Sequence, residues 1–461
     1  MVVQHNMQAA NANRMLNVTT SAQSKSTEKL SSGYRINRAA DDAAGLSISE
    51  KMRKQIKGLD KASSNAEDGV SSVQTAEGAL TEVHSMLQRM NELAVQASNG
   101  TNSDTDRSAI QDEISQLTTE IDRVAETTKF NETYLLKGGN GTKDVYMNGH
   151  DAGLKGTLTD SATTATFKVA AGALDAGKSV TIGGKDYTIG STLDETKALA
   201  NAAKAATNTS FTVDDTKYNV DAAGKITKDG DATEVTVDNI VKTGSKVSYD
   251  GKTLTAADID AATGVDKSDS SVISAAHAVD LMEKELTAAN NIGATKTAAT
   301  AKKAAAYTSK DGVTFDIKKG TAEVADKLSF SLHVGSDADM TNKITVDIET
   351  MNSSYLGIKG LNVNDDSGIA GTYAIDAISD ALQKVSEQRS SLGAVQNRLE
   401  HTIDNLDNVV ENTTTAESRI RDTDMAEEMV NYSKNNILAQ AGQSMLAQAN
   451  QSNQGVLSLL Q

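Results

Sequence analysis

The sequence predicts a mainly α protein whose long helices lie toward both ends of the chain, with a β-rich insertion between them. Two patterns lead to this class. Apolar residues recur at helical spacing over long stretches near both ends, whereas the segment from about 160 to 325 contains short β-type runs bounded by turn residues. Aromatic residues make up only 3 % of the 461 residues. That composition argues against one large, densely packed catalytic core.

The longest helical stripe lies between residues 48 and 94. It runs through Ile48, Met52, Ile56, Leu59, Ala62, Ala66, Val70, Val73, Ala76, Leu80, Val83, Leu87, Met90 and Ala94. These positions recur about every 3.5 residues, which is closer to the seam of a coiled coil than to the period of a free helix. At ~1.5 Å per residue the helix would be about 70 Å long. The stripe therefore predicts a rod, and Asn99-Gly100 is expected to end it.

Two further stripes are expected to pack beside the first. The second begins at Ser103-Asp104-Thr105-Asp106, because such side chains cap a helix N-terminus and interact favourably with its dipole. Its apolar positions are Ile110, Ile114, Leu117, Ile121 and Val124. The third stripe lies far away in the chain, at Ile375, Ile378, Leu382, Val385, Leu392, Val395, Leu399, Ile403, Leu406 and Val410. Rods with matching seams pack side by side, so the first and last thirds of the chain should meet in space.

Both ends of the chain carry helical patterns without charge. Residues 1–13 and 435–461 contain no Lys, Arg, Asp or Glu. The C-terminal stretch nevertheless repeats apolar residues at helical spacing, at Leu438, Ala441, Met445, Ala449, Val456 and Leu460. A solvated helix usually carries charges opposite its apolar stripe, so these segments favour contact with other protein on most sides. The alternative is disorder in the isolated chain, because ends rich in Gln, Asn and Ser often fray.

The middle of the chain changes to a strand pattern. Residues 180–182 and 187–189 flank Gly183-Gly184, and residues 211–213 and 218–220 flank Asp214-Asp215, so both read as hairpins. Helical pieces are expected near 193–206 and 271–289. A final strand pair at 328–332 and 344–348 leads back to the third rod. The middle is therefore expected to be a small α+β or β-rich insertion.

A search for catalytic and cofactor motifs yields little. The absence of Cys excludes disulfides, thiolate catalysis and Cys-ligated metal sites. Residues 172–179 (GALDAGKS) fit a nucleotide-binding loop, but a strand rather than a helix follows, so we expect no phosphate site. The six His include no pair spaced as in a helical zinc-protease motif. We therefore expect no enzyme, no metal and no cofactor.

The charge and the hydropathy limit the classes of partner and the location. A formal net charge of −17 disfavours nucleic acid as a partner. No apolar run approaches the ~18 residues of a membrane span. The start of the chain lacks a basic segment followed by an apolar one, so no cleaved signal peptide is expected. The chain should therefore stay in the cytoplasm unless a route that reads no cleaved signal exports it.

Three segments resemble the bacterial flagellins. Residues 30–46 (LSSGYRINRAADDAAGL) and 87–100 (LQRMNELAVQASNG) resemble the N-terminal flagellin signature, and residues 390–461 resemble the matching C-terminal end. The resemblance covers about 1–160 and 326–461. Residues 161–325 carry no motif of a family that we recognise, as expected of the surface insertion that varies among flagellins.

The resemblance implies an architecture of three parts. Residues 1–36 with 412–461 would form terminal helices, as an antiparallel coiled coil that lines a filament core. Residues 37–160 with 326–411 would form a helical rod domain with a β-hairpin, which builds the tube wall. Residues 161–325 would project outward. In the core, the expected packing residues are Val3, Met7, Leu438, Met445, Val456 and Leu460.

The resemblance also implies a function and partners. The chain would self-assemble into the extracellular flagellar filament used for swimming, after export in unfolded form by the flagellar type III apparatus. An export chaperone, the filament cap and hook–filament junction proteins would be its partners. The flagellin-sensing Toll-like receptor of vertebrates would read the face formed by Arg89, Leu93 and Glu113. Two alternatives are a hook–filament junction protein, which shares similar helical ends, and an enzyme displayed on a filament.

Overall fold

The chain folds into two compact units that share two long helices. The computed structural model describes residues 6–260, 262–365 and 368–458. The terminal unit comprises Met1–Ser71, Ser331–Val346 and Val395–Gln461, and the central unit comprises Ser72–Phe330 and Asp347–Ala394. Helices α2 (Ala43–Ala97) and α8 (Ile369–Arg421) contribute residues to both units. These helices contain the first and third predicted stripes.

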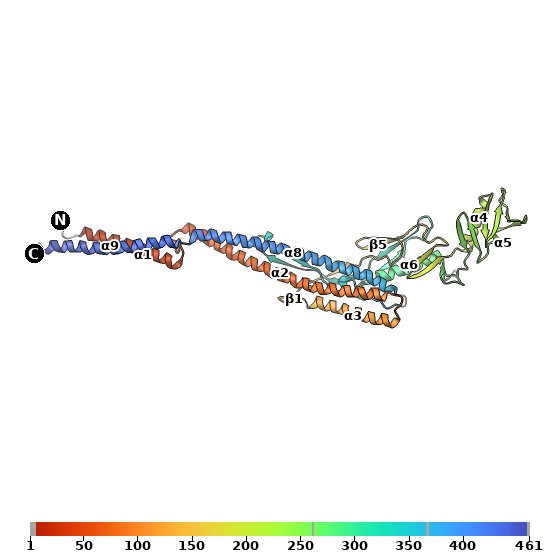
Figure 1. The fold of residues 1–461 in the computed structure, drawn as a ribbon, viewed down its shortest axis with the longest axis horizontal. Helices are drawn as coiled ribbons and strands as arrows, with labels where there is room; N and C mark the ends of the chain where they lie inside the picture. Colours follow the sequence, from red (N-terminus) through yellow and green to blue (C-terminus); the bar gives the residue numbers. More distant parts are fainter. Residues whose placement is uncertain (1–5, 261, 366–367, 459–461) are drawn as a thin grey trace. The chain divides into compact units, whose positions relative to one another are not determined.

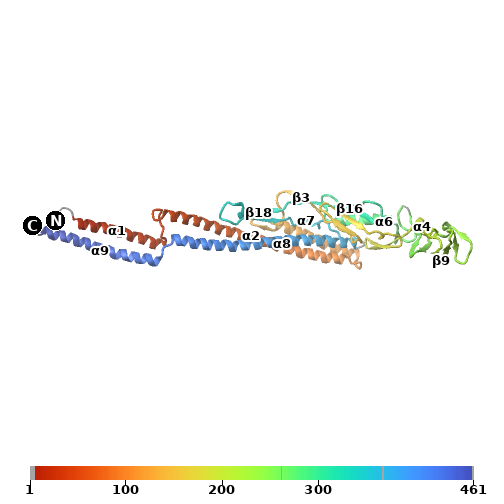
Figure 2. The ribbon, with the colours of Figure 1, turned by 90° about the horizontal axis from the view of Figure 1, so that it is seen from above.

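In the terminal unit, the two ends of the chain form a helix pair. Helices α1 (Met7–Ser32) and α9 (Met425–Ser458) lie side by side in both views (Figures 1 and 2). The Asn6 side chain accepts a hydrogen bond from the backbone N–H of Ala9, and its amide donates to the carbonyl of Ala449 at 3.1 Å. Gly33 ends α1 in the left-handed conformation, with φ of 76°. The described residues at both ends are therefore helical, as the apolar spacing predicts.

The rest of the terminal unit contains parts of α2 and α8 and residues 331–346, which pack along an apolar seam. Leu59 and Ala62 of α2 pack against Leu406 of α8, and a neighbouring cluster consists of Ala66, Val334, Ile344 and Leu399. At the edge of the seam, the Ser63 hydroxyl donates to an Asp407 carboxylate oxygen at 3.2 Å. The first and last thirds of the chain thus meet as the matching stripes predict.

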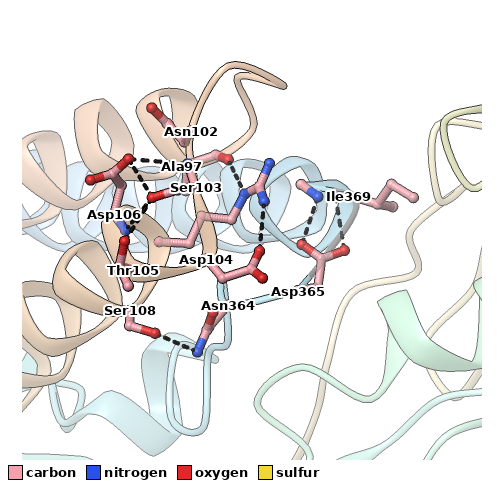
Figure 3. Close-up of polar contacts among 12 residues, drawn as sticks. Ala97, Asn102, Ser103, Asp104, Thr105, Asp106, Ser108, Asn364, Asp365 and Ile369 are labelled. Atoms are coloured by element: carbon pink, nitrogen blue, oxygen red, sulfur yellow. Dashed lines mark hydrogen bonds and ion pairs between the residues drawn. The ribbon is translucent and has the colours of Figure 1, made fainter.

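The helical part of the central unit adds α3 (Asp104–Thr127) to the remaining turns of α2 and α8. Helix α3 buries the stripe residues Ile110, Ile114 and Ile121. It begins with a reciprocal capping box, in which the Ser103 side chain accepts from the N–H of Asp106 and the Asp106 side chain accepts from the N–H of Ser103 (Figure 3). The second predicted helix is confirmed, including its cap.

The described strands form six sheets. The largest has the order β11-β10-β9-β8-β12-β13 and consists of β8 (Thr209–Val213), β9 (Thr216–Val220), β10 (Ile226–Lys228), β11 (Glu234–Val235), β12 (Lys246–Tyr249) and β13 (Lys252–Thr255). A four-stranded sheet has the order β15-β16-β5-β4 and consists of β4 (Thr157–Asp160), β5 (Thr164–Val169), β15 (Thr300–Lys303) and β16 (Val313–Lys318). A three-stranded sheet, β14-β7-β6, consists of β6 (Ser179–Ile182), β7 (Lys185–Ile189) and β14 (Val272–Ile273).

Three two-stranded sheets complete the β structure of the described chain. They pair β1 (Lys129–Phe130) with β2 (Thr133–Tyr134), β3 (Thr142–Tyr146) with β17 (Thr321–Ala325), and β18 (Leu328–His333) with β19 (Lys343–Ile348). Short helices connect these strands, namely α4 (Leu193–Ala205), α5 (Val237–Ile240), α6 (Ala275–Asn290), the 3-10 turn η1 (Met340–Asn342) and α7 (Ser353–Leu356). The predicted hairpins are confirmed, because Val180 pairs with Tyr187 and Phe211 pairs with Tyr218.

The β-rich part of the central unit has two large hydrophobic cores and a smaller cluster around Met147, Ala322 and Val324. One lies between α6 and the four-stranded sheet and buries Phe167, Phe315 and Leu286. The other lies between α4 and the six-stranded sheet and buries Phe211 and Ala200. Long terminal helices and a β-rich middle, the predicted fold class at this level, are confirmed. None of the described helices combines the length and apolarity needed to cross a bilayer.

Candidate interaction surfaces

The helix pair α1–α9 keeps almost all of its side chains in contact with solvent. Among the described side chains of these two helices, only Ser26 and Ala439 are buried. The large apolar side chains exposed on them are Met7, Met15, Val18, Met425, Met429, Val430, Ile437, Leu438 and Met445. They are nine of the fifteen exposed large hydrophobic side chains in the described chain. Such a concentration on one helix pair marks an interaction surface.

A groove runs between the two helices. Its volume is about 760 Å³, and its lining includes Met15 and Leu16 from α1 and Leu438, Gly442 and Met445 from α9. The polar lining residues are uncharged, namely Gln8, Asn11, Thr19, Gln448 and Ser452. An apolar groove with an uncharged polar rim can be covered by another helix without burying an unpaired charge.

The structure brings together some of the predicted core-packing residues. Leu438 and Met445 both line the groove, and Leu438 is 48 % exposed. Met7 is also exposed but lies outside the groove lining. Val3 and Leu460 lie outside the described residues, and Val456 belongs to α9 but its side chain lies outside the described part.

The second predicted surface, Arg89 with Leu93 and Glu113, lies in the central unit between α2 and α3. The Arg89 Nε donates to a Glu113 carboxylate oxygen at 2.9 Å, and its Nη1 donates to Glu92 at 3.1 Å. The hydrogen bond to Glu113, followed by that to Glu92, raises the pKa of Arg89 above its usual value. Arg89 and Glu113 are exposed, whereas Leu93 is only 2 % exposed. Leu93 is therefore not part of the accessible face.

The turn between α2 and α3 fixes the relative position of these side chains. Arg107, a buried residue of α3, donates its Nε to the carbonyl of Ala97 at 3.2 Å and lies 3.6 Å from the Asp104 carboxylate. In this way it satisfies a carbonyl at the C-terminus of α2, where a cation is favourable. Beside it, the Asn364 amide donates to the Ser108 hydroxyl at 3.1 Å (Figure 3). These contacts hold the start of α3 against the end of α2.

Comparisons with known proteins agree with this arrangement. The model of the bacterial flagellin N-terminal helical region matches residues 3–141, and the model of the C-terminal helical region matches residues 375–460. Flagellin from Clostridium tyrobutyricum is 41 % identical over 98 % of this chain and 100 % of its own length. The chain belongs to the bacterial flagellin family. Flagellin from Bacillus subtilis (strain 168) is 36 % identical over the full length of both chains, and flagellin B from Vibrio anguillarum is 35 % identical over 99 % of each.

Membership of the flagellin family makes the chain a structural protein of the extracellular flagellar filament and not an enzyme. One segment, residues 172–179, fits a nucleotide-binding loop by sequence, and the structure shows the strand that was expected to follow it. Residues 172–179 end in strand β6, and the N–H groups of Gly177 and Lys178 already donate to the carbonyls of Ile189 and Asp175. Among the described residues, no cluster of His, Asp or Glu is arranged to hold a metal ion.

Sequence reasoning missed part of the apolar surface of this flagellin-family chain. Met425, Met429, Val430 and Ile437 of α9 are exposed, yet none was identified as a candidate. The spacing of Met425 and Met429, four residues apart, places both on one face of the helix and was a usable signal. Met425, Met429 and Val430 precede the charge-free stretch that begins at residue 435, whereas Ile437 lies within it.

Proposed function

We propose that this chain polymerises through α1 and α9, which bury their exposed apolar side chains against neighbouring copies of the same helices. The observation that carries the proposal is the scarcity of buried side chains on both helices, since only Ser26 and Ala439 are buried among the described side chains. Helices derive most of their stability from packing an apolar face. A pair that exposes this much apolar surface therefore gains stability when other copies cover it.

The proposed packing residues are Val3, Met7, Leu438, Met445, Val456 and Leu460. Burial of apolar surface contributes roughly 25 cal/mol per Å², and a specific contact usually buries ~1,000 Å² or more. Growth into a filament requires a heterologous contact, in which different patches meet and the ring does not close. The exposed residues lie on several faces of the helix pair, which supports contacts with more than one neighbour.

We assign the three sequence regions to three layers of the filament. Residues 1–36 and 412–461 form the core as a coiled coil, residues 37–160 and 326–411 form the wall, and residues 161–325 project outward. The hydrophobic core between α4 and the six-stranded sheet supports the last assignment, because its residues all lie within 161–325.

The proposal includes export of the unfolded chain by the flagellar type III apparatus, with an export chaperone, the filament cap and hook–filament junction proteins as partners. The composition supports passage of an unfolded chain. Without Cys it cannot form cross-links, and without Pro it has no X–Pro bond whose isomerisation would slow folding after export.

Electron microscopy of the purified chain after salt-induced polymerisation tests the assembly proposal. We expect long helical filaments from the full chain and none after deletion of residues 435–461. Filaments that still form after the deletion would contradict the role of the C-terminal helix. A hook–filament junction protein would not form long filaments by itself, so the same micrographs separate the two functions.

We also propose that the flagellin-sensing Toll-like receptor of vertebrates recognises the region around Arg89, Leu93 and Glu113. The exposed Arg89–Glu113 ion pair supports this assignment, whereas Leu93 is buried. In a receptor reporter assay with monomeric protein, we expect Arg89→Ala and Glu113→Ala to weaken the response. An unchanged response with both variants would contradict the assignment.

A further inference from the structure

Nine of the twelve methionines in the described part of the chain lie at two extremes of exposure, whereas Met52 and Met86 are half-buried and Met340 is exposed outside the terminal helices. Met90, Met147, Met282 and Met351 are all buried, at 4 % exposure or less. In contrast, the methionines of the terminal helices are 51–67 % exposed, and they are Met7, Met15, Met425, Met429 and Met445. Both groups are therefore present in one molecule, one shielded by a folded core and one open to solvent.

The composition concentrates oxidant sensitivity on these side chains. The chain contains no Cys, so its 13 Met carry all of its sulfur, and it also contains no Trp. Oxidation of Met converts a flexible apolar thioether into a polar sulfoxide and disrupts Met-rich interfaces. The exposed methionines lie where such a change would matter, since Met15 and Met445 line the α1–α9 groove from opposite helices.

We propose that Met7, Met15, Met425, Met429 and Met445 are oxidation sites that switch off assembly of the free subunit. The inference rests on the proposed polymerisation through α1 and α9. In the free chain the thioethers are open to oxidants, and their sulfoxides place polar oxygen atoms in the surface that other copies must cover. Burial in the polymer then protects the same side chains.

The oxidant is a peroxide, and the step balances without any group from the protein. The lone pair of Met Sδ attacks one oxygen of hydrogen peroxide, so that an S–O bond forms as the O–O bond breaks. The second oxygen leaves as water after proton transfer. Sulfur loses two electrons and the peroxide gains them. Methionine sulfoxide reductases reverse the product, so the switch is reversible.

Site-resolved mass spectrometry tests the accessibility. Free subunit and preformed filament are treated with hydrogen peroxide, and the sulfoxide fraction is measured at each methionine. In the free subunit we expect the five terminal-helix methionines to oxidise at least about tenfold faster than the four buried ones. In the filament this difference should largely vanish. Equal rates in free and polymerised protein would overturn the protection by assembly.

Polymerisation assays test the consequence. Oxidised wild-type protein should polymerise at least about tenfold less readily than untreated protein, and reductase treatment should restore it. A variant with M7L, M15L, M425L, M429L and M445L keeps the apolar volume and should polymerise with or without peroxide. The control variant M340L removes a methionine that is 73 % exposed outside both helices, and it should stay sensitive.

Two results would overturn the switch. One is normal polymerisation of wild-type protein that carries sulfoxide at all five positions. The other is equal loss in the five-leucine variant, which would place the damage elsewhere. Failure of the assembly proposal has a different signature, because untreated wild-type protein would then form no filaments, and the switch would fall with it.

Discussion

Helices α6 and α9 show two different ways in which an apolar helix of this chain is accommodated. Helix α6 of the central unit buries its apolar face within the chain, with Met282 and Leu286 almost fully shielded. Helix α9 of the terminal unit buries only Ala439 among its described side chains, and it exposes Leu438 and Met445. Helix α6 thus finds its packing partners within a single molecule, whereas the terminal helix pair leaves an exposed apolar surface.

The sharpest test of this comparison substitutes the same residue type in both helices. Leu286→Ala creates a cavity in a packed core, and we expect it to lower the free energy of unfolding of the central unit by about 2–5 kcal/mol. Leu438→Ala removes a half-exposed side chain, so we expect a change within about 0.5 kcal/mol in the monomer. Thermal and denaturant unfolding of the two purified monomers measure both effects.

Assembly should respond in the opposite order. Leu438→Ala should raise the concentration needed for polymerisation, since the side chain is proposed to become buried only between copies. Leu286→Ala should leave that concentration unchanged at temperatures where the central unit stays folded. If Leu286→Ala alone impaired polymerisation, the assignment of stability to α6 and of assembly to α9 would be wrong.

Removal of the N-terminal caps of α1 and α3 tests the same comparison with smaller expected changes in stability. Ser103→Ala breaks a reciprocal capping box on a packed helix and should cost about 1 kcal/mol of central-unit stability. Asn6→Ala removes a single cap from α1, whose apolar side chains are exposed. It should reduce helix content by circular dichroism without lowering the unfolding temperature of the central unit. A drop in that temperature for Asn6→Ala would show that the helix pair stabilises more than itself.

The sequence predicted the long helices well because apolar residues recur at helical spacing along most of their length. The stripe from 48 to 94 falls inside α2 and ends within a few residues of Ala97, and Ser103 announces α3 by its capping chemistry. Turn residues predicted the hairpins of the insertion equally well, because Gly183-Gly184 and Asp214-Asp215 adopt the positive φ values that tight turns require. Local rules sufficed for these elements.

The surfaces were predicted less completely, because exposure depends on which elements cover a helix. Leu93 matched a recognition residue by type, yet it is buried where α3 runs beside α2. A residue match carries no information on which way the side chain faces. Conversely, Met425 and Met429 of α9 were missed although their spacing places them on one face, because the charged residues Glu427 and Glu428 made the segment look like ordinary solvated helix.

The smallest predicted effect concerns the central unit at alkaline pH. Burial raises the pKa of Tyr355 from 10.0 to about 12, with Glu349 and Glu387 adding to the shift. A raised pKa means that the neutral phenol is favoured in the folded state. Its contribution to stability is therefore complete below pH 10 and is lost as the pH rises through 12. Because Tyr355 remains partly exposed, solvent screening reduces the expected loss to about 1 kcal/mol.

Tyr355→Phe isolates this titration from that of its neighbour. Lys384 donates to the Tyr355 carbonyl at 2.8 Å, and burial lowers the pKa of its ammonium, so stability gained as it deprotonates would partly offset the loss from the phenol. Subtracting the unfolding free energy of Tyr355→Phe from that of the wild type at each pH cancels the lysine contribution to first order. The difference should be constant up to pH 10 and fall above it, whereas a flat difference to pH 12 would mean that the phenol titrates alike in the folded and unfolded chain.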